Sequence, residues 1–225
     1  MPGDSPQTGL TDRLAAGLVA SVTQAGSALA APGLHRALLR LLADGAPVAI
    51  AQLAAAAGQP VTDVENTVAG WPDTEYDEQG RIVGWGITLN PTPHRFTVDG
   101  RELYTWCALD TLFFPAVIGR RAHVESSCQA SGVPIRLTVD PANGVIDLEP
   151  ATSVVSVVIP ERMTAVRAAF CNPGRFFVSA DAARDWQAAH PGMHVLPVAE
   201  AYQAARPLSE RLLSGAGDAQ ACCPS

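Results

Sequence analysis

The chain has 225 residues, of which 48% are hydrophobic and 16% are charged, and its formal net charge at pH 7 is −7. This composition is ample for a packed core and argues against a disordered chain, while the acidic balance lacks the basic footprint of a nucleic-acid-binding protein. All 15 basic residues are arginine, so Schiff-base chemistry on a lysine and a phosphate-loop lysine are excluded.

The chain begins with an extension, residues 1–33, that is rich in small residues. Residues 1–8 carry no positive charge ahead of an apolar run, so we expect no signal peptide. A helix is predicted over residues 11–20, with Thr11 as its cap. The apolar stretch over residues 14–42 is interrupted by glycines, a proline and an arginine, which is not the pattern of a membrane span. We therefore expect a cytoplasmic protein with no membrane partner.

Residues 34–98 show the outline of a winged helix, a helix-turn-helix variant. Three short segments have helical periodicity and two strand-like runs follow them: the helices cover residues 34–42, 50–57 and 61–69, and the strands cover residues 81–89 and 96–98. The third helix would be the recognition helix of a DNA reader, but it contains Asp63 and Glu65 and no basic residue. Because this charge is wrong for DNA phosphates, we expect a structural or covering domain and no nucleic-acid partner.

A second and larger domain is predicted over residues 99–213. Its sequence shows both helical and strand-like periodicity. The predicted helices cover residues 103–112, 161–169, 182–189 and 198–213, and the predicted strands cover residues 122–126, 135–139, 154–159 and 176–179. Residues 214–225 are small and polar and form a predicted flexible tail.

Cysteines are the residues best suited to carry chemistry, and the chain has five: Cys107, Cys128, Cys171, Cys222 and Cys223. Their odd number and wide spacing argue against a disulfide framework, and the paired spacing of a structural zinc site is missing. The histidines form no HxxxH or HExxH pattern, although a Cys–His nucleophile pair needs only spatial proximity and stays open. For Cys128, which lies between two predicted strands, structural support is the favoured interpretation.

Cys107 and Asp110 stand three positions apart, so on a predicted helix they share one face. The residues around Asp110 are apolar, and a carboxyl in such surroundings has a raised pKa unless it is paired. Such a group can carry a proton in a reaction. Cys171 precedes the turn signal of residues 172–174. For each thiol, packing in the core is an open alternative to a catalytic role.

The segments around these residues resemble organomercurial lyase, also called alkylmercury lyase. The similarity covers roughly residues 34–213, and the Trp-Cys-Ala-Leu-Asp segment with a later Phe-Cys and Phe-Phe is its specific signature. The matching segments are residues 74–77, 80–86, 103–112, 114–116, 118–120, 170–171, 176–177 and 185–186.

The resemblance implies an α+β fold, with an N-terminal winged-helix-like helical domain packed on a C-terminal mixed domain of small antiparallel sheets and helices. It implies that Cys107, Asp110 and Cys171 are catalytic and hold the product Hg(II), and that Cys128 is structural. The implied reaction is protonolysis of a carbon–mercury bond, in substrates such as methylmercury or phenylmercury, to give a hydrocarbon and Hg(II). No organic cofactor or resident metal is required, but external low-molecular-weight thiols are needed for turnover.

Two features leave room for other interpretations. The vicinal pair Cys222 and Cys223 resembles the terminal pair with which mercuric reductase carries Hg(II), which suggests product transfer, and an unselected tail is the alternative. The same thiols would also serve a metal-sensing winged-helix regulator or a soft-metal carrier without catalysis. The acidic third helix argues against the regulator, and Asp110 argues for cleavage over carriage.

Overall fold

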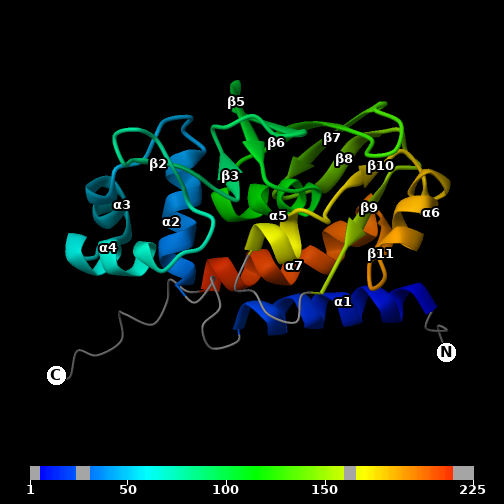
Figure 1. Ribbon diagram of the computed structural model, residues 1–225, viewed down its shortest axis with the longest axis horizontal. Helices are drawn as coiled ribbons and strands as arrows, with labels where there is room; N and C mark the ends of the chain where they lie inside the picture. The colour runs from blue at the N-terminus through cyan, green and yellow to red at the C-terminus, as the bar shows by residue number, and fades with distance from the viewer. Residues whose placement is uncertain (1–5, 24–30, 160–165, 215–225) are drawn as a thin grey trace.

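The computed structural model describes residues 6–23, 31–159 and 166–214. In Figure 1 an antiparallel sheet lies above long helices, and three short helices pack at one end. The helices are α1 (Pro6–Thr23), α2 (Pro32–Leu42), α3 (Ile50–Ala57), α4 (Val61–Ala69), α5 (Ala108–Ile118), α6 (Ala180–Ala189) and α7 (Val198–Ser214), with a π-helical turn, η1 (Arg167–Cys171).

The described strands form two antiparallel sheets. The larger has the order β1-β2-β3-β5-β4-β6-β7-β8 and the smaller has the order β10-β9-β11. The strands are β1 (Glu75–Tyr76), β2 (Ile82–Trp85), β3 (Ile87–Thr88), β4 (His94–Val98), β5 (Arg101–Thr105), β6 (Ala122–Ser127), β7 (Pro134–Asp140), β8 (Gly144–Glu149), β9 (Val154–Val157), β10 (Phe176–Phe177) and β11 (His194–Pro197). The predicted α+β class is therefore confirmed.

Helices α2, α3 and α4 form where the apolar periodicity predicts them. The buried face of α2 is built from leucines at helical spacing, Leu34, Leu38, Leu39 and Leu42. Helix α3 ends at Gly58, whose φ of 65° lies in the left-handed region that glycine tolerates. The buried ring of His35 stacks on Trp71 with centroids 3.7 Å apart and also contacts Trp85. These rings join the helices to strand β2.

The predicted wing differs from the observed strands. Residues 81–89 are divided at Gly86, whose φ is 73°, into β2 and β3. A Cβ at Gly86 would lie 2.5 Å from the Phe114 ring, so a larger residue does not fit there. Residues 96–98 belong to β4, which lies between β5 and β6 in the middle of the larger sheet. The alternating pattern located these strands, but their partners depend on long-range pairing.

Residues 103–112 contain a strand and a helix, which corrects the prediction of a single helix. Asp99 and Gly100 have φ values of 48° and 75° and form the two-residue loop of a β4–β5 hairpin. Strand β5 therefore extends to Thr105, and the helix begins only at Ala108. Helix α5 is buried along almost its whole length and lies between the larger sheet and α7 (Figure 1). It is the central element of the core.

The remaining elements complete the helical layer. Helix α1, which confirms the helix predicted over residues 11–20, lies along α7 (Figure 1). It already includes Pro6, so Thr11 lies inside it and is not its cap. Most of the helix predicted over residues 161–169 falls outside the described residues. Strands β8 and β11 were not predicted. Strand β8 lacks a clean alternation of buried and exposed positions. Among the described helices, none is long and apolar enough to cross a membrane.

Candidate active site

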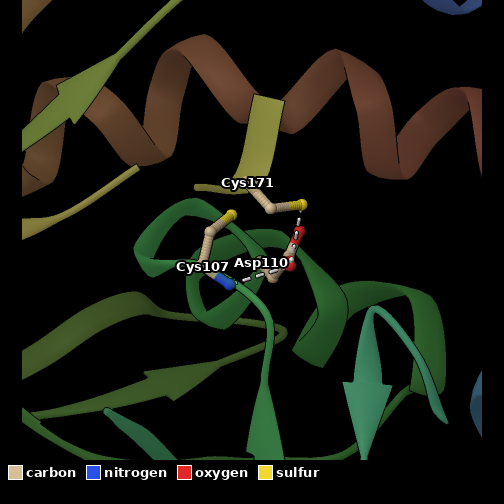
Figure 2. A group of neighbouring side chains, drawn as sticks. All are labelled: Cys107, Asp110 and Cys171. Atoms are coloured by element: carbon tan, nitrogen blue, oxygen red, sulfur yellow. Dashed lines mark hydrogen bonds between the residues drawn. The ribbon is translucent and has the colours of Figure 1, made fainter. Parts of the chain in front are cut away.

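The three residues predicted to carry the chemistry lie together in the structure (Figure 2). Cys107 and Asp110 stand at the start of α5, and Cys171 ends η1 on the opposite side. The two sulfurs and a carboxylate oxygen all lie within 4.8 Å of one another. Their exposed fractions are 0% for Cys107, 3% for Asp110 and 1% for Cys171. Within the described residues, no other cluster of His, Cys, Asp or Glu side chains could hold a metal ion.

Cys107 is the N-cap of α5 and not a residue inside the helix. Its backbone is extended, with φ −145° and ψ 170°. Its backbone N–H donates to Asp110 Oδ2 at 3.2 Å, and its side chain accepts from the Asp110 backbone N–H. This is a capping box in which cysteine and aspartate replace the usual Ser or Thr and Glu. The two side chains therefore meet through the cap, and the prediction of a shared helical face is wrong about how they meet.

A tight turn brings Cys171 against Cys107. The Gly174 N–H donates to the Cys171 carbonyl at 2.9 Å, and the Ala108 N–H donates to the Gly174 carbonyl at 3.1 Å. A Cβ added to Gly174 would lie 3.2 Å from the Cβ of Cys107, which is closer than ordinary packing allows. The approach of the turn to the start of α5 therefore depends on a glycine.

The Asp110 carboxyl holds its proton up to near neutral pH. Burial raises its pKa to about 7, although hydrogen bonds from both thiols and the charge of Arg167 act to lower it. The Cys171 thiol donates to Asp110 Oδ2 over 3.8 Å. An acid with a pKa near the working pH is well suited to proton transfer. The raised pKa predicted from the apolar neighbours is confirmed.

Both thiols are protonated at neutral pH. Burial raises the pKa of Cys107, against a hydrogen bond with Cys171 that lowers it. The hydrogen bond with Cys107, burial and the charge of Asp110 raise the pKa of Cys171 well above its usual value. A metal that binds thiolates displaces the thiol protons. Asp110 is within hydrogen-bonding reach to receive one of them.

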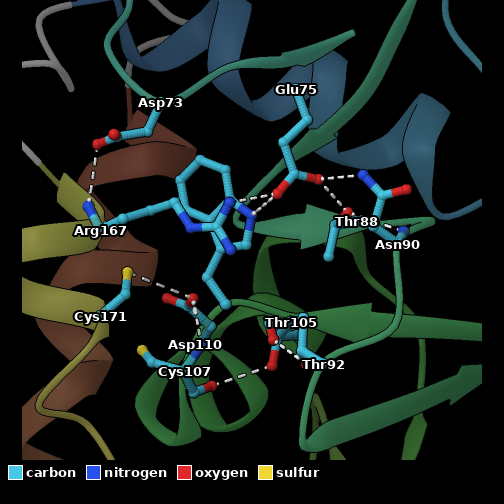
Figure 3. Close-up of polar contacts among 11 residues, drawn as sticks. Asp73, Glu75, Thr88, Asn90, Thr92, Thr105, Cys107, Asp110, Arg167 and Cys171 are labelled. Atoms are coloured by element: carbon cyan, nitrogen blue, oxygen red, sulfur yellow. Dashed lines mark hydrogen bonds and ion pairs between the residues drawn. The ribbon is translucent and has the colours of Figure 1, made fainter. Parts of the chain in front are cut away.

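A polar network that the sequence did not reveal lies beside the thiols (Figure 3). Glu75 on β1 accepts from the Thr88 hydroxyl, the Asn90 amide at 2.9 Å and the Trp106 indole at 3.1 Å. Its fourth donor is the Arg167 guanidinium, which lies 4.9 Å from the centroid of the Trp106 ring. Glu75 belongs to a segment that carries the family resemblance, but no local pattern pairs it with a residue 92 positions away.

A small cavity of about 30 Å³ adjoins Asp110 and Cys171. Gly86 and Arg211 also line it, and its other walls are apolar: Trp85, Trp106, Phe113, Phe114, Val166, Phe170, Leu208 and Leu212. These residues come from two stretches of the chain, residues 85–114 and 166–212. The cavity suits a small hydrophobic organic group such as methyl.

The other candidate residues lie elsewhere. Cys128 is 2% exposed in the turn after β6, where its N–H donates to the Val133 carbonyl at 2.9 Å. Burial acts to raise its pKa, but hydrogen bonds around residues 130, 131 and 178 outweigh burial and lower it. Cys222 and Cys223 lie outside the described residues. His35 and His94 are buried, and burial lowers the pKa of each to about 3. In the described chain no histidine hydrogen-bonds to Cys107 or Cys171, so the Cys–His alternative lacks support.

Comparisons with known proteins agree with this site. The helix-turn-helix domain of alkylmercury lyase matches residues 12–86, and the alkylmercury lyase family matches residues 87–210. The chain is 53% identical to the alkylmercury lyase of Streptomyces lividans over 203 residues, which are 90% of this chain and 94% of that protein. It is 49% identical to the alkylmercury lyase of Staphylococcus epidermidis over 198 residues, 88% and 91% of the two chains. The solved mercury-bound form of MerB2 has the same fold, with a TM-score of 0.71 and 22% identity, over 90% of this chain and 98% of that one.

A helix-turn-helix module joined to a buried pair of thiols and a carboxylate defines a protein of soft-metal chemistry. The family match over residues 87–210 and the identity of the relatives show the particular family: the chain belongs to the alkylmercury lyases. It is therefore an organomercurial lyase, an enzyme that breaks carbon–mercury bonds. The two matched ranges meet where β2 and β3 are neighbours in the larger sheet. The predicted domain limits at residues 33, 98 and 213 stay predictions.

Proposed function

We propose that this alkylmercury lyase acts by protonolysis, with Cys107 and Cys171 as the mercury ligands and Asp110 as the proton donor. The observation that carries the proposal is the convergence of two sulfurs and a carboxylate oxygen within 4.8 Å. Mercury is a soft metal and prefers thiolate ligands to oxygen. An adjacent carboxyl with a pKa of about 7 can exchange protons with the thiols at neutral pH.

The first step is thiol exchange on the organomercurial, which arrives as a thiol adduct R–Hg–SR′. One cysteine forms a sulfur–mercury bond, the mercury–SR′ bond breaks, and the cysteine proton leaves with the free thiol R′SH. Either Cys107 or Cys171 can act first. The cavity beside Asp110 receives the organic group R.

The second step breaks the carbon–mercury bond. The other cysteine passes its proton to the ionised Asp110 and binds mercury as a thiolate. Two thiolates add electron density to mercury, so the carbon–mercury bond becomes polarised toward carbon. Asp110 then gives the proton to carbon, the bonding electron pair becomes the carbon–hydrogen bond, and the hydrocarbon RH leaves. Hg(II) stays on Cys107 and Cys171 with Asp110, which is ionised again.

The burial of the site supports both steps. Asp110 and both thiols are almost fully shielded from solvent, so water competes little with the thiols for mercury or with Asp110 for the proton. The reaction balances without an organic cofactor or a resident metal, and mercury enters as substrate. Two thiolates hold Hg(II) tightly, so low-molecular-weight thiols are expected to extract the product.

The terminal pair Cys222 and Cys223 is proposed to collect the product ion and pass it onward, with a mercuric reductase as the expected receiver. The support is chemical, since two adjacent thiols suit a soft metal. A double variant, Cys222→Ser with Cys223→Ser, should slow repeated turnover when external thiol is limiting and leave the single-turnover rate unchanged. Unchanged repeated turnover under that condition would refute the transfer role.

The proposed reaction is tested by headspace gas chromatography of methane released from methylmercury, with excess cysteine present. Wild type should release methane, and Cys107→Ser and Asp110→Ala should lose about 10²- to 10⁴-fold in rate, the usual contribution of a proton-transferring group. Asp63→Asn, on the exposed face of α4, is the matched control and should keep the wild-type rate. Methane release by Asp110→Ala at the wild-type rate would contradict the assigned role.

If wild type binds mercury but releases no methane, a carrier or sensor explains the thiols instead. A DNA mobility shift assay would then separate those two. The exposed positions of α4 contain Asp63 and Glu65, so the expected result is no shift.

A further inference from the structure

Glu75 occupies a place built to hold a carboxylate. Its oxygens accept hydrogen bonds from Thr88, Asn90, Trp106 and Arg167, so both oxygens have partners. A Cβ on the neighbouring Gly84 would lie 2.3 Å from Glu75 Oε2, and only glycine leaves room for the carboxylate there. A partly buried carboxylate with this many donors is fixed in one position.

Arg167 is held at both ends by the N-terminal module (Figure 3). Its guanidinium forms an ion pair with Glu75 and lies over the Trp106 ring. Its backbone N–H donates to Asp73 Oδ2 at 3.0 Å. Both acids belong to the range matched by the helix-turn-helix domain. The helix-turn-helix module thereby fixes Arg167, which lies in the range matched by the alkylmercury lyase family.

Arg167 is joined to Cys171 through one π-helical turn. It is the first residue of η1 and Cys171 is the last. The Asn172 N–H donates to the Arg167 carbonyl at 2.7 Å, which closes the π-helical turn. The Cys171 thiol then reaches Asp110 Oδ2 at 3.8 Å. The chain of contacts therefore runs from Glu75 through Arg167 to the second thiol.

We propose that Glu75 is a positioning residue for carbon–mercury cleavage: acting through Arg167, it holds the turn that presents Cys171 to Asp110. This inference rests on the proposed function. Within the described residues, no hydrogen bond or ion pair joins Glu75 to either thiol, so it does not touch the reacting atoms. Capture of the organomercurial needs one thiol, whereas cleavage needs both thiols and Asp110 in place. Loss of Glu75 should therefore slow cleavage and leave capture almost intact.

The test compares the wild type with Glu75→Gln, which keeps the size of the side chain and removes its charge. A displacement of about 1 Å at a reacting centre can cost on the order of 10²-fold in rate. We expect methane release from methylmercury in a single turnover to fall about 10- to 100-fold, and KM to change by less than about twofold. Glu75→Asp should recover part of the lost rate.

Asp77→Asn is the matched control. Asp77 lies two residues further along the same segment and pairs with Arg81 at 2.7 Å, away from the thiols. Its removal takes an ion pair from the same region without affecting Arg167. We expect a lowered melting temperature and the wild-type cleavage rate. A cleavage loss in Asp77→Asn equal to that in Glu75→Gln would overturn the proposal, since general loosening would explain both.

The double variant Glu75→Gln with Arg167→Met tests whether Glu75 acts through Arg167. Residues that act as one unit show non-additive losses, so the double variant should be no slower than the slower single variant. Losses that multiply in the double variant would overturn the proposal, and so would a wild-type rate in Glu75→Gln.

If Glu75→Gln does not fold, as judged by circular dichroism, folded Arg167→Met decides in its place. A slower cleavage rate with an unchanged KM supports the proposal, and a wild-type rate overturns it. A wild type that releases no methane would instead contradict the proposed function itself.

Discussion

The two halves of the site are held in different ways. Cys107 and Asp110 are neighbours in the chain and are joined by hydrogen bonds of the helix cap that they form. Cys171 lies 61 positions after Asp110, and its turn is anchored at Arg167 by Asp73 and Glu75, which are 94 and 92 positions earlier than Arg167. One half is therefore local, and the other requires the N-terminal module to be folded and in place. A winged-helix-like module with an acidic third helix thus has a structural task in an enzyme.

The largest effect is expected from Asp110→Asn, which tests the local half. Burial raises the pKa of Asp110 to about 7, whereas an unfolded aspartate has a pKa of about 4, so keeping the folded carboxyl ionised costs about 4 kcal/mol. In the wild type, the unfolded state loses this proton first as pH rises. The free energy of unfolding therefore falls between about pH 4 and pH 7 and levels off above pH 7.

Asparagine removes that dependence and keeps an oxygen to accept from the Cys107 N–H. Urea unfolding should show Asp110→Asn to be more stable than wild type above pH 7, by up to about 4 kcal/mol, and equal to it near pH 4. The variant should release almost no methane. Equal stability of the two proteins at pH 8 would show that the carboxyl is not destabilised by burial.

Gly174→Ala tests the contact between the halves. The new Cβ would lie 3.2 Å from the Cβ of Cys107 and 3.3 Å from the Cys171 carbonyl, so it pushes the two cysteines apart. We expect about a tenfold loss in the single-turnover rate, since small displacements of reacting groups are costly. Stability should fall by about 1 kcal/mol, the usual size of a steric change. Gly70→Ala is the control, because its Cβ would meet only the Thr67 carbonyl at 3.5 Å. Full activity of Gly174→Ala would argue against a close-fitted site.

Cys128→Ser should have the smallest effect on cleavage, because Cys128 belongs to neither half. Its thiol is buried in a turn that is closed by hydrogen bonds to its own backbone. We expect the free energy of unfolding to fall by about 1 to 2 kcal/mol, measured by urea titration, and the methane rate to stay unchanged. A rate loss as large as that of Cys107→Ser would give Cys128 a catalytic role and contradict this assignment.

The same division explains what the sequence could predict. The spacing of Cys107 and Asp110 and the apolar residues around them predicted a thiol beside an acid of raised pKa. The cap geometry was missed, because the Asp99–Gly100 hairpin turns residues 101–105 into a strand. Cys171 was found through the resemblance, since nothing local distinguishes it from a core cysteine. The pairing of Glu75 with Arg167 is purely tertiary, and no periodicity or spacing records it.

If both halves of the site form one catalytic unit, single-turnover methane release by three variants will show it. Cys171→Ser, Asp110→Ala and the double variant, all of which keep Cys107 for capture, would be compared with wild type at equal methylmercury occupancy. We expect a large loss in each single variant and no further loss in the double variant, because the second thiol and the carboxyl act together. Cleavage by Cys171→Ser at the wild-type rate would contradict this expectation, since the half held by the N-terminal module would then be dispensable.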